Sequence, residues 1–339
     1  MEALVRAGHA VTLYTEHWDQ PPAGVQVRTV PASGARRLRP IRFAEAIDAA
    51  VKPADFDCVF SLERTLRQDV YRAGDGVHRT WVEQRRRFAP WWRRPFLRTA
   101  GFHRAMCELE ARTFDVRSTR RVIVNSAMVG AEIQRHFGFP ADRLHLVRNG
   151  IHVERFQNGQ RDACRARFGI RPDEHLLLFV GSGWERKGLP QLFRALKQPE
   201  LAGSRFRLLV VGKGRASGAP SQVVFAGAMA DVENAYAAAD LLTFLPIYEP
   251  SANVVVEARA AGLPVVTTVF NGAAEWLHPG IDGEVLPDPS DAPAVARAIA
   301  RWIDRGPVRP PADLPAMSLD RNVRETIEVL EQAARERIG

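Results

Sequence analysis

The sequence is poor in cysteine and has no long apolar run. Its three cysteines, Cys58, Cys107 and Cys164, are scattered and odd in number, so they fit neither a disulfide framework nor a metal-ligand spacing. No apolar stretch approaches the roughly 18 residues that a membrane-spanning helix needs. These shortages argue against a disulfide-stabilised secreted protein and an integral membrane protein, and they predict a reducing, cytoplasmic environment.

Lysine is also scarce, although the chain is basic. The formal net charge is +8, and four of the 47 basic residues are lysines: Lys52, Lys187, Lys197 and Lys213. A GC-rich genome would explain the preference for arginine, but it would not explain where the excess charge lies. Between Arg79 and Arg104 there are eight arginines and a single acid, Glu83.

Aromatic side chains are interleaved with these arginines. They are Trp81, Phe88, Trp91, Trp92, Phe96 and Phe102. Cations suit anionic lipid head groups and indole rings suit the boundary of a bilayer, so the segment Arg79–Arg104 predicts binding to an anionic membrane surface. Nucleic acid is a second candidate ligand for such a composition, and a solvated helix with aromatic side chains in the core is a third explanation. We expect the membrane surface, and no nucleic acid, as the partner of this segment.

The 339 residues are enough for two domains of ordinary size. Short apolar strands alternate with helical stretches, which predicts an α/β protein with parallel sheets. In the first half, strands are expected over residues 10–15, 25–30, 57–62, 121–125 and 144–148, and helices over 43–51 and 126–137, the second capped by Ser126. In the second half, strands are expected over 176–180, 206–211, 222–226, 241–245 and 264–268, and helices over 231–239 and 253–261.

The turn signal Asn149-Gly150 marks the boundary between the two halves. We expect two Rossmann-like domains facing a cleft, over residues 1–152 and 153–317, with ligands at the carboxyl ends of the strands. From Ser318 on, apolar residues recur at helical spacing. Residues 318–339 are therefore expected to form an amphipathic helix that packs back toward the N-terminal domain.

The first residues predict that the N-terminal sheet lacks a strand. Residues 1–7 have the pattern of the second half of a helix, and Gly8 is placed to end it before the strand at 10–15. A two-layer α/β domain normally has a strand in the middle of its sheet before that helix. We therefore expect roughly 20 further residues upstream of Met1. Without them, expression and activity should be low.

A glycine-rich loop, GSGWERKG at residues 181–188, follows the strand at 176–180. Gly181 and Gly183 allow the backbone to approach a phosphate, and Lys187 supplies a positive charge for it. The dinucleotide fingerprint G-x-G-x-x-G requires glycine where this chain has Arg186, which argues against a nicotinamide cofactor.

Two glutamates stand eight positions apart in the segment EPSANVVVE, residues 249–257. Asn253 opens a helix whose free N–H groups favour an anion. Glu249 precedes that helix and Glu257 lies one turn inside it. A carboxylate can accept two hydroxyl hydrogen bonds, as a ribose or hexose diol requires. Two solvated glutamates are the simpler alternative, but the valines at 254–256 indicate a buried helix, where an unpartnered glutamate is costly.

These two segments, together with the run VVFAGAMADVENAYAAADLLTFLP at 223–246, resemble the retaining glycosyltransferases of family 4, which have the GT-B fold. Asn149-Gly150-Ile151 with Phe156 matches the linker of that family. The bacterial lipopolysaccharide core α-glucosyltransferases are especially similar, and QDVYRAGDGVH at 68–78 resembles the loop of their acceptor-binding domain. The resemblance extends from about Ala3 to the final helix.

The resemblance implies roles for individual residues of both domains. Lys187 would bind the donor diphosphate with help from Arg186, because Ser182 stands where many relatives have arginine. Glu249 would hold hydroxyls of the transferred sugar, and Glu257 the ribose. The implied donor-binding residues are Gly181, Gly183, Arg186, Lys187, Ala228, Met229, Ser251, Ala252, Asn253, Val254 and Glu257, with Ala228 and Met229 near the base. The implied catalytic residues are Glu249, Lys187, Asp75 and His78, the last two from the N-terminal, acceptor-binding domain.

The resemblance also implies the reaction. A sugar would pass from a nucleotide-sugar donor such as UDP-glucose to a glycan or glycolipid such as lipopolysaccharide core, with retained anomeric configuration. No cofactor and no metal are expected, and the D-x-D at residues 55–57 is interpreted as a helix-to-strand turn. The enzyme would be cytoplasmic, peripheral on the inner face of the membrane. Two alternatives are a sugar-nucleotide epimerase of the same fold and an inactive homologue that binds membrane or nucleic acid through the Arg79–Arg104 segment.

Overall fold

The structure of the protein is a computed structural model that describes residues 1–32, 34–35, 38–92, 94, 101–214, 218–306, 308 and 311–338. The chain divides into two compact units. Unit 1 comprises Met1–Val147 and Asn322–Gly339, and unit 2 comprises Arg148–Arg321. This division assigns most of the last helix to unit 1, whereas the sequence places the boundaries after residues 152 and 317.

Unit 1 contains two separate parallel sheets. The smaller pairs β1 (Val11–Thr15) with β2 (Val25–Thr29). The larger has the order β3 (Phe60–Ser61), β4 (Gln68–Arg72), β5 (Thr119–Val124) and β6 (Leu144–Leu146). β1 is only half-buried along its whole length, whereas the four residues from Gln68 to Tyr71 are buried. The N-terminal sheet is thus divided in two, and β1 pairs with β2 alone among the described strands.

Local signals mark the end of one helix of unit 1 and the start of another. The helices of this unit are α1 (Glu2–Arg6), α2 (Arg39–Ala50), α3 (His78–Phe88), α4 (Gly101–Thr113), α5 (Ala127–Phe137) and, from Asn322 on, α12 (Leu319–Ile338), with short 3₁₀ turns at Pro53–Asp55 (η2) and Ala141–Arg143 (η4). Gly8, with a φ of 89°, follows α1 as expected. The Ser126 hydroxyl accepts a hydrogen bond from the Val129 N–H at 3.3 Å, which confirms the predicted N-cap of α5.

Two sequence predictions for unit 1 were wrong in detail. The strand expected at 57–62 is reduced to Phe60–Ser61, because the Val59 N–H donates to the Asp69 carboxylate at 2.8 Å instead of to a neighbouring strand. The segment 68–78, expected as one loop, begins with β4, because its polar residues Gln68 and Asp69 are buried and hydrogen-bonded inside the sheet. The D-x-D at 55–57 does lie in the turn between α2 and β3.

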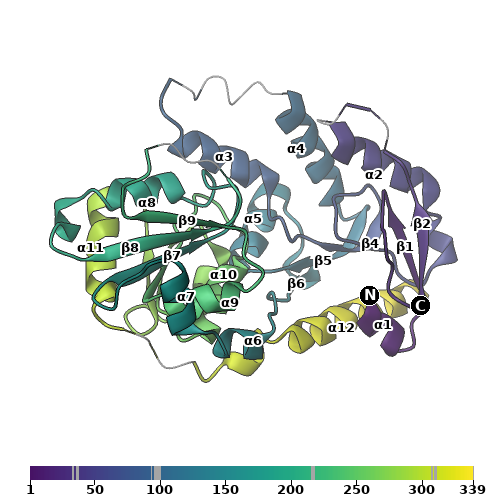
Figure 1. Ribbon diagram of the computed structural model, residues 1–339. Helices are drawn as coiled ribbons and strands as arrows, with labels where there is room; N and C mark the ends of the chain where they lie inside the picture. Colours follow the sequence, from purple (N-terminus) through teal and green to yellow (C-terminus); the bar gives the residue numbers. More distant parts are fainter. Residues whose placement is uncertain are drawn as a thin grey trace. The chain divides into compact units, whose positions relative to one another are not determined.

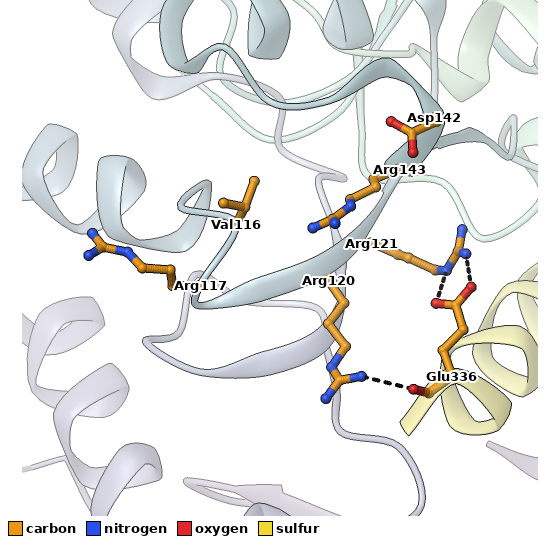
Figure 2. Close-up of a pocket in the computed structure, with 7 residues that line it drawn as sticks. All are labelled: Val116, Arg117, Arg120, Arg121, Asp142, Arg143 and Glu336. Atoms are coloured by element: carbon orange, nitrogen blue, oxygen red, sulfur yellow. Dashed lines mark hydrogen bonds and ion pairs between the residues drawn. The ribbon is translucent and has the colours of Figure 1, made fainter. Parts of the chain in front are cut away.

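The end of α12 is fixed to the larger sheet of unit 1. Leu330 and Ala333 pack in one cluster with Val70 and Ile123 of β4 and β5. Farther along the helix, the Glu336 carboxylate accepts hydrogen bonds from the Arg121 guanidinium (Figure 2). The last helix of the chain therefore completes the core of the first unit.

Unit 2 is built on one six-stranded parallel sheet. Its order is β12 (Gly283–Leu286), β11 (Val265–Thr268), β10 (Leu241–Thr243), β7 (His175–Val180), β8 (Phe206–Val211) and β9 (Val223–Gly227). From β7 the chain proceeds outward through β8 and β9, and it then returns to place β10 on the other side of β7. The pair β7–β10 is therefore the point at which the strand order reverses.

Helices cover both faces of this sheet (Figure 1). They are α6 (Val153–Gln157), α7 (Arg161–Arg167), α8 (Leu189–Ala195), α9 (Val232–Ala238), α10 (Asn253–Ala260) and α11 (Ala292–Ile303), with 3₁₀ turns at Pro199–Leu201, Gly272–Trp276 and Leu314–Met317. Gly150 precedes α6, and a Cβ there would lie 2.5 Å from the Ser318 carbonyl oxygen, so only glycine fits this close backbone approach. In the part of the chain that the structure describes, no helix is both long and apolar enough to span a bilayer.

We predict that Asp240→Ala strongly destabilises unit 2. Asp240 is buried, and its carboxylate accepts from the Leu176 N–H at 2.7 Å and pairs with Arg161 and Arg165. Removing it leaves the buried Arg165 guanidinium without its carboxylate, which should lower the free energy of unfolding by about 3–5 kcal/mol. Urea denaturation followed by circular dichroism measures the loss.

The matched control for that variant is Asp173→Ala. Asp173 pairs with Arg171 and Arg205 at the surface, where water screens the charges. The unfolding midpoint of Asp173→Ala should stay close to that of the parent. An equal loss of unfolding free energy in the two variants would contradict the structural role of Asp240.

Candidate active site

The loops that follow β7 and β10 meet at the reversal point of the unit 2 sheet. They carry the two candidate segments, residues 181–188 and 249–257. The Ile247 N–H donates to the Arg186 carbonyl oxygen at 3.0 Å, which joins the two loops by their backbones. Open α/β sheets bind ligands at this position, beyond the carboxyl ends of two diverging strands.

Glycine is required for this junction. Gly188 has a φ of 83°, and a Cβ there would lie 1.8 Å from the Leu245 carbonyl oxygen. A Cβ on Gly212, which follows β8, would lie 2.3 Å from the carbonyl oxygen of Gly181. The loop 181–188 is thus held against its neighbours by direct backbone approach. Gly183, with a φ of 75°, has open space around it.

Lys187 brings a half-buried positive charge to the junction. Its side chain lies against Gly181, and its Nζ is 5.7 Å from the centroid of the Phe244 ring. Burial lowers the pKa of the Lys187 ammonium, the nearby Glu249 carboxylate opposes this, and Arg186 lowers it further. The ammonium makes no hydrogen bond or ion pair with the described residues, so it is placed to receive an anion.

Glu249 is held by backbone and side chain alike. Its N–H donates to the Phe270 carbonyl at 2.8 Å, and its own carbonyl accepts from the Gly272 N–H at 2.9 Å. Its carboxylate Oε2 lies 2.9 Å from Nη1 of Arg186, whose guanidinium also donates to the Tyr248 carbonyl. Arg186 therefore orients Glu249 in this structure. The resemblance instead implied that Arg186 helps to bind the diphosphate.

The start of α10 offers free backbone donors. Helix α10 begins at Asn253, as predicted, and no side chain caps its first N–H groups within the described structure. The Asn271 side chain accepts from the Ala252 N–H at 3.2 Å and so fixes the approach to the helix. The Ser251 hydroxyl is buried and has no hydrogen-bond partner among the described residues. The N–H groups of Asn253 and Val254 are thus available to an anion.

Glu257 lies inside α10 with one oxygen engaged. The buried Tyr236 hydroxyl donates to its Oε2 at 2.5 Å. Burial raises the pKa of the Glu257 carboxyl, and the hydrogen bond from Tyr236 opposes part of that rise. Burial, followed by the negative charge of Glu257, raises the pKa of Tyr236 well above its ordinary value. Tyr236 therefore remains a donor, and the second oxygen of Glu257 is available to a ligand.

Two further predicted donor residues lie at the same edge of the sheet but farther along it. Ala228 and Met229 follow β9, which β8 separates from β7. Ala228 is exposed, while Met229 packs partly against the core. They therefore lie two strands away from β7 along this edge.

The two predicted residues of unit 1 lie in the turn between β4 and α3. Asp75 is exposed, and His78 is the half-buried first residue of α3. The Asn125 amide donates to the Gly74 carbonyl at 3.0 Å, and the Arg64 guanidinium donates to the Gly76 carbonyl at 2.7 Å. Burial lowers the pKa of His78 to about 4, with further contributions from Arg64 and His103, so its ring is neutral at physiological pH.

A buried carboxylate fixes the start of α3. Glu110 of α4 is fully buried and accepts from the backbone N–H groups of His78 at 2.6 Å and Arg79 at 3.0 Å. It also pairs with the nearly buried Arg64 guanidinium at 3.1 Å. The negative charge satisfies the first N–H groups of the helix, and the turn that carries Asp75 is thereby held from both ends.

Sequence reasoning missed three residues that position these groups: Tyr236, Asn271 and Glu110. Glu110 did have a signal, because it is a lone acid on the buried face of α4 with Met106 and Leu109. A carboxylate on such a face needs a buried partner. Tyr236 contacts Glu257, and Asn271 contacts the Ala252 N–H, only in the folded unit. The sequence carries no local signal for either contact.

The Arg79–Arg104 segment is described only in part. Arg93 and residues 95–100, including Phe96, lie outside the described residues. Arg85, Arg86 and Arg87 form the basic last turn of α3. Trp91 and Trp92, which follow α3, are 79% and 53% exposed. The two tryptophans are therefore at the surface and not in the core.

A basic cavity in unit 1 is separate from the candidate site. It has a volume of about 550 Å³ and is lined by arginines around the beginning of β5 (Figure 2). Arg121 pairs there with Glu336, and Arg120 with Asp69 at 3.2 Å. Arg120 and Arg121 are thus paired with carboxylates, and they lie near the amino end of β5, away from the carboxyl ends of the strands.

Comparisons with known proteins agree with this arrangement. The family model "Glycosyltransferase Family 4" matches residues 1–155, and the model "Glycosyl transferases group 1" matches residues 174–305. The lipopolysaccharide glucosyltransferase WaaG of Escherichia coli K12 is 28% identical over 320 residues, which cover 89% of this chain and 83% of WaaG.

Solved structures give the same fold. The crystal structure of WaaG superposes with a TM-score of 0.76 at 24% identity, covering 98% of this chain and 92% of that one. Anabaena Alr3699/HepE in complex with UDP-glucose superposes with a TM-score of 0.63 at 16% identity, covering 97% of this chain and 99% of that one.

We predict that Tyr236→Phe raises the pKa of Glu257 further. The hydroxyl of Tyr236 stabilises the charged carboxylate, so its removal leaves burial less opposed. A pH titration of the ¹³C-labelled glutamate carboxyl signals measures the change. Tyr14→Phe, in unit 1, should leave Glu257 as in the parent. An unchanged or lower pKa of Glu257 in Tyr236→Phe would show that the hydrogen bond does not form.

Proposed function

Because this chain belongs to glycosyltransferase family 4 and has the GT-B fold of two Rossmann-like domains, we propose that it moves glucose from UDP-glucose to a lipopolysaccharide-core acceptor with retained anomeric configuration. The observation that carries the proposal is the junction of two loops that brings Lys187, Glu249 and Glu257 to the reversal point of one sheet. The names of WaaG and of the UDP-glucose complex support the choice of acceptor and donor.

Each donor group has a matching protein group in unit 2. The half-buried ammonium of Lys187 and the free N–H groups of Asn253 and Val254 suit a diphosphate. The free oxygen of Glu257 suits a ribose hydroxyl, and Glu249, oriented by Arg186, suits hydroxyls of the glucose. Ala228 and Met229 would lie near the base.

The proposed mechanism needs no protein nucleophile. The acceptor hydroxyl attacks the anomeric carbon on the face from which UDP departs, and the departing phosphate takes the hydroxyl proton. Lys187 and the N–H groups of α10 stabilise the negative charge that develops on the leaving group. The protein thus contributes positioning and charge stabilisation, with no metal and no cofactor. Asp75 and His78, held in their turn by Asn125, Arg64 and Glu110, act on the transferred sugar.

The two alternatives are less well supported. An epimerase of the same fold and an inactive homologue both fit the sequence, but WaaG, which is similar over most of the chain, is a glucosyltransferase.

We predict that Lys187→Ala and Glu257→Ala each weaken UDP-glucose binding. Each variant loses a charge-assisted hydrogen bond, so the dissociation constant should rise by about tenfold to a hundredfold. Glu249→Gln should instead lower kcat, because Glu249 contacts the sugar that reacts. Calorimetry gives the binding constants, and product formation gives kcat.

Lys197→Ala is the matched control for the lysine variant. Lys197 is an exposed lysine of the same unit, so donor binding and turnover should equal those of the parent. Unchanged donor affinity in both Lys187→Ala and Glu257→Ala would refute the proposed donor site.

We further propose that the enzyme works at the inner, cytoplasmic face of the membrane and binds anionic lipid through the Arg79–Arg104 segment. The exposed Trp91 and Trp92 and the basic turn at Arg85–Arg87 support the proposal. A lipid-linked acceptor would be concentrated at the same surface.

We predict binding to vesicles with anionic phospholipid that decreases as the salt concentration rises. The double variant Arg93→Glu with Arg94→Glu should release the protein in a flotation assay, because it reverses charge beside the tryptophans. The control Arg117→Glu with Arg335→Glu makes the same change of net charge at two exposed arginines elsewhere. Equal binding of the two double variants would contradict the proposed surface.

A further inference from the structure

Three side chains of unit 1 form a hydrogen-bonded row between α3 and α4. Nε2 of His78 lies 3.0 Å from Nδ1 of His103. On the far side of the His103 ring, Nη1 of Arg85 lies 3.3 Å from Nε2. The two imidazole rings have centroids 5.2 Å apart and are inclined by 30°. Because both short contacts involve ring nitrogens, the proton positions on the two rings are linked.

Arg85 determines the direction of both hydrogen bonds. A guanidinium group can donate but cannot accept, so its contact requires a lone pair on Nε2 of His103. A neutral imidazole with that lone pair carries its proton on Nδ1. This Nδ1–H then donates to Nε2 of His78. The single proton of a neutral His78 ring is therefore on Nδ1.

Both rings have reason to be neutral. Burial lowers the pKa of His78 to about 4, and burial followed by Arg85 lowers the pKa of His103. Among the described residues, the charged groups that face the pair are the Arg64 and Arg85 guanidinium groups, and the Glu110 carboxylate is bound to the backbone N–H of His78. Both shifts favour the neutral rings that this arrangement of protons requires.

We propose that Arg85 and His103 are positioning residues that fix His78 as the Nδ1–H tautomer, so that His78 offers a hydrogen-bond donor and not a base to the transferred sugar. The inference rests on the role of His78 in the proposed function. Because Nε2 of His78 is engaged by His103, the ring cannot take the proton of the acceptor hydroxyl through that nitrogen. The tautomer thus agrees with transfer of that proton to the departing phosphate.

The tautomer can be measured without any substrate. Long-range ¹H–¹⁵N correlation spectra of ¹⁵N-histidine-labelled protein distinguish protonated from unprotonated ring nitrogens, and His78→Gln assigns the signals. In the parent we expect a protonated Nδ1 and an unprotonated Nε2 on His78. In Arg85→Met, the Nε2–H tautomer of His78 should become populated. Arg86→Met, which removes the same charge from an exposed neighbour, should reproduce the parent spectrum.

Two outcomes of the spectra would overturn the proposal. One is a His78 ring protonated on Nε2 in the parent. The other is Arg85→Met having the same His78 signals as Arg86→Met. A merely structural contact would leave the tautomer unmoved in both variants.

Turnover measures the consequence of the tautomer. With a soluble acceptor and UDP-glucose, His103→Leu should lower kcat about tenfold with the KM for UDP-glucose unchanged, because one hydrogen bond to His78 is lost. His103→Asn places an amide N–H near the position of Nδ1 and should recover most of the rate. Equal losses in the two variants would overturn the positioning role. Full activity of His78→Ala would instead refute the proposed role of His78, and the spectra would still decide the tautomer.

Discussion

The backbone pairing of β7 with β10 is the constraint on which the candidate site depends. These strands are distant in sequence, yet Leu177 pairs with Leu241 and Leu178 with Leu242 at the centre of the unit 2 sheet. The loops that leave them have to share one edge, and they do so by direct backbone approach at Gly188. Lys187, Glu249 and Glu257 lie on or beside this junction, which explains why the glycine loop at 181–188 and the later segment at 249–257 can serve one ligand.

The junction is also where the protein leaves polar groups unsatisfied. The Lys187 ammonium is half-buried without an anion, and the Ser251 hydroxyl is buried without a partner in the described part of the chain. The buried hydroxyl alone costs on the order of 1–3 kcal/mol in the free protein. A ligand with phosphate and hydroxyl groups recovers that cost on binding. The supporting residues, by contrast, have partners: Arg186 contacts Glu249, Tyr236 donates to Glu257, and Glu110 accepts from the start of α3.

The sequence predicts the fold class, the sites of most strands and the helix starts at Ser126 and Asn253, because these follow from local periodicity and capping. The motif residues Lys187, Glu249 and Glu257 are predictable for the same reason, since each stands at a fixed place after a strand or in a helix. The polar strand β4 is not predictable in this way, because Gln68 and Asp69 form their hydrogen bonds only in the folded sheet. The partners Tyr236 and Glu110 also escape prediction, because sheet order and helix packing bring them to their sites.

The most direct test of the central claim is a crystal structure of the protein with intact UDP-glucose bound. The account predicts the diphosphate within ion-pair distance of the Lys187 ammonium and in front of the first N–H groups of α10, with ribose hydroxyls on the free oxygen of Glu257. The glucose should contact Glu249. A donor bound away from the junction of the two loops, or a diphosphate that does not contact Lys187, would contradict the account.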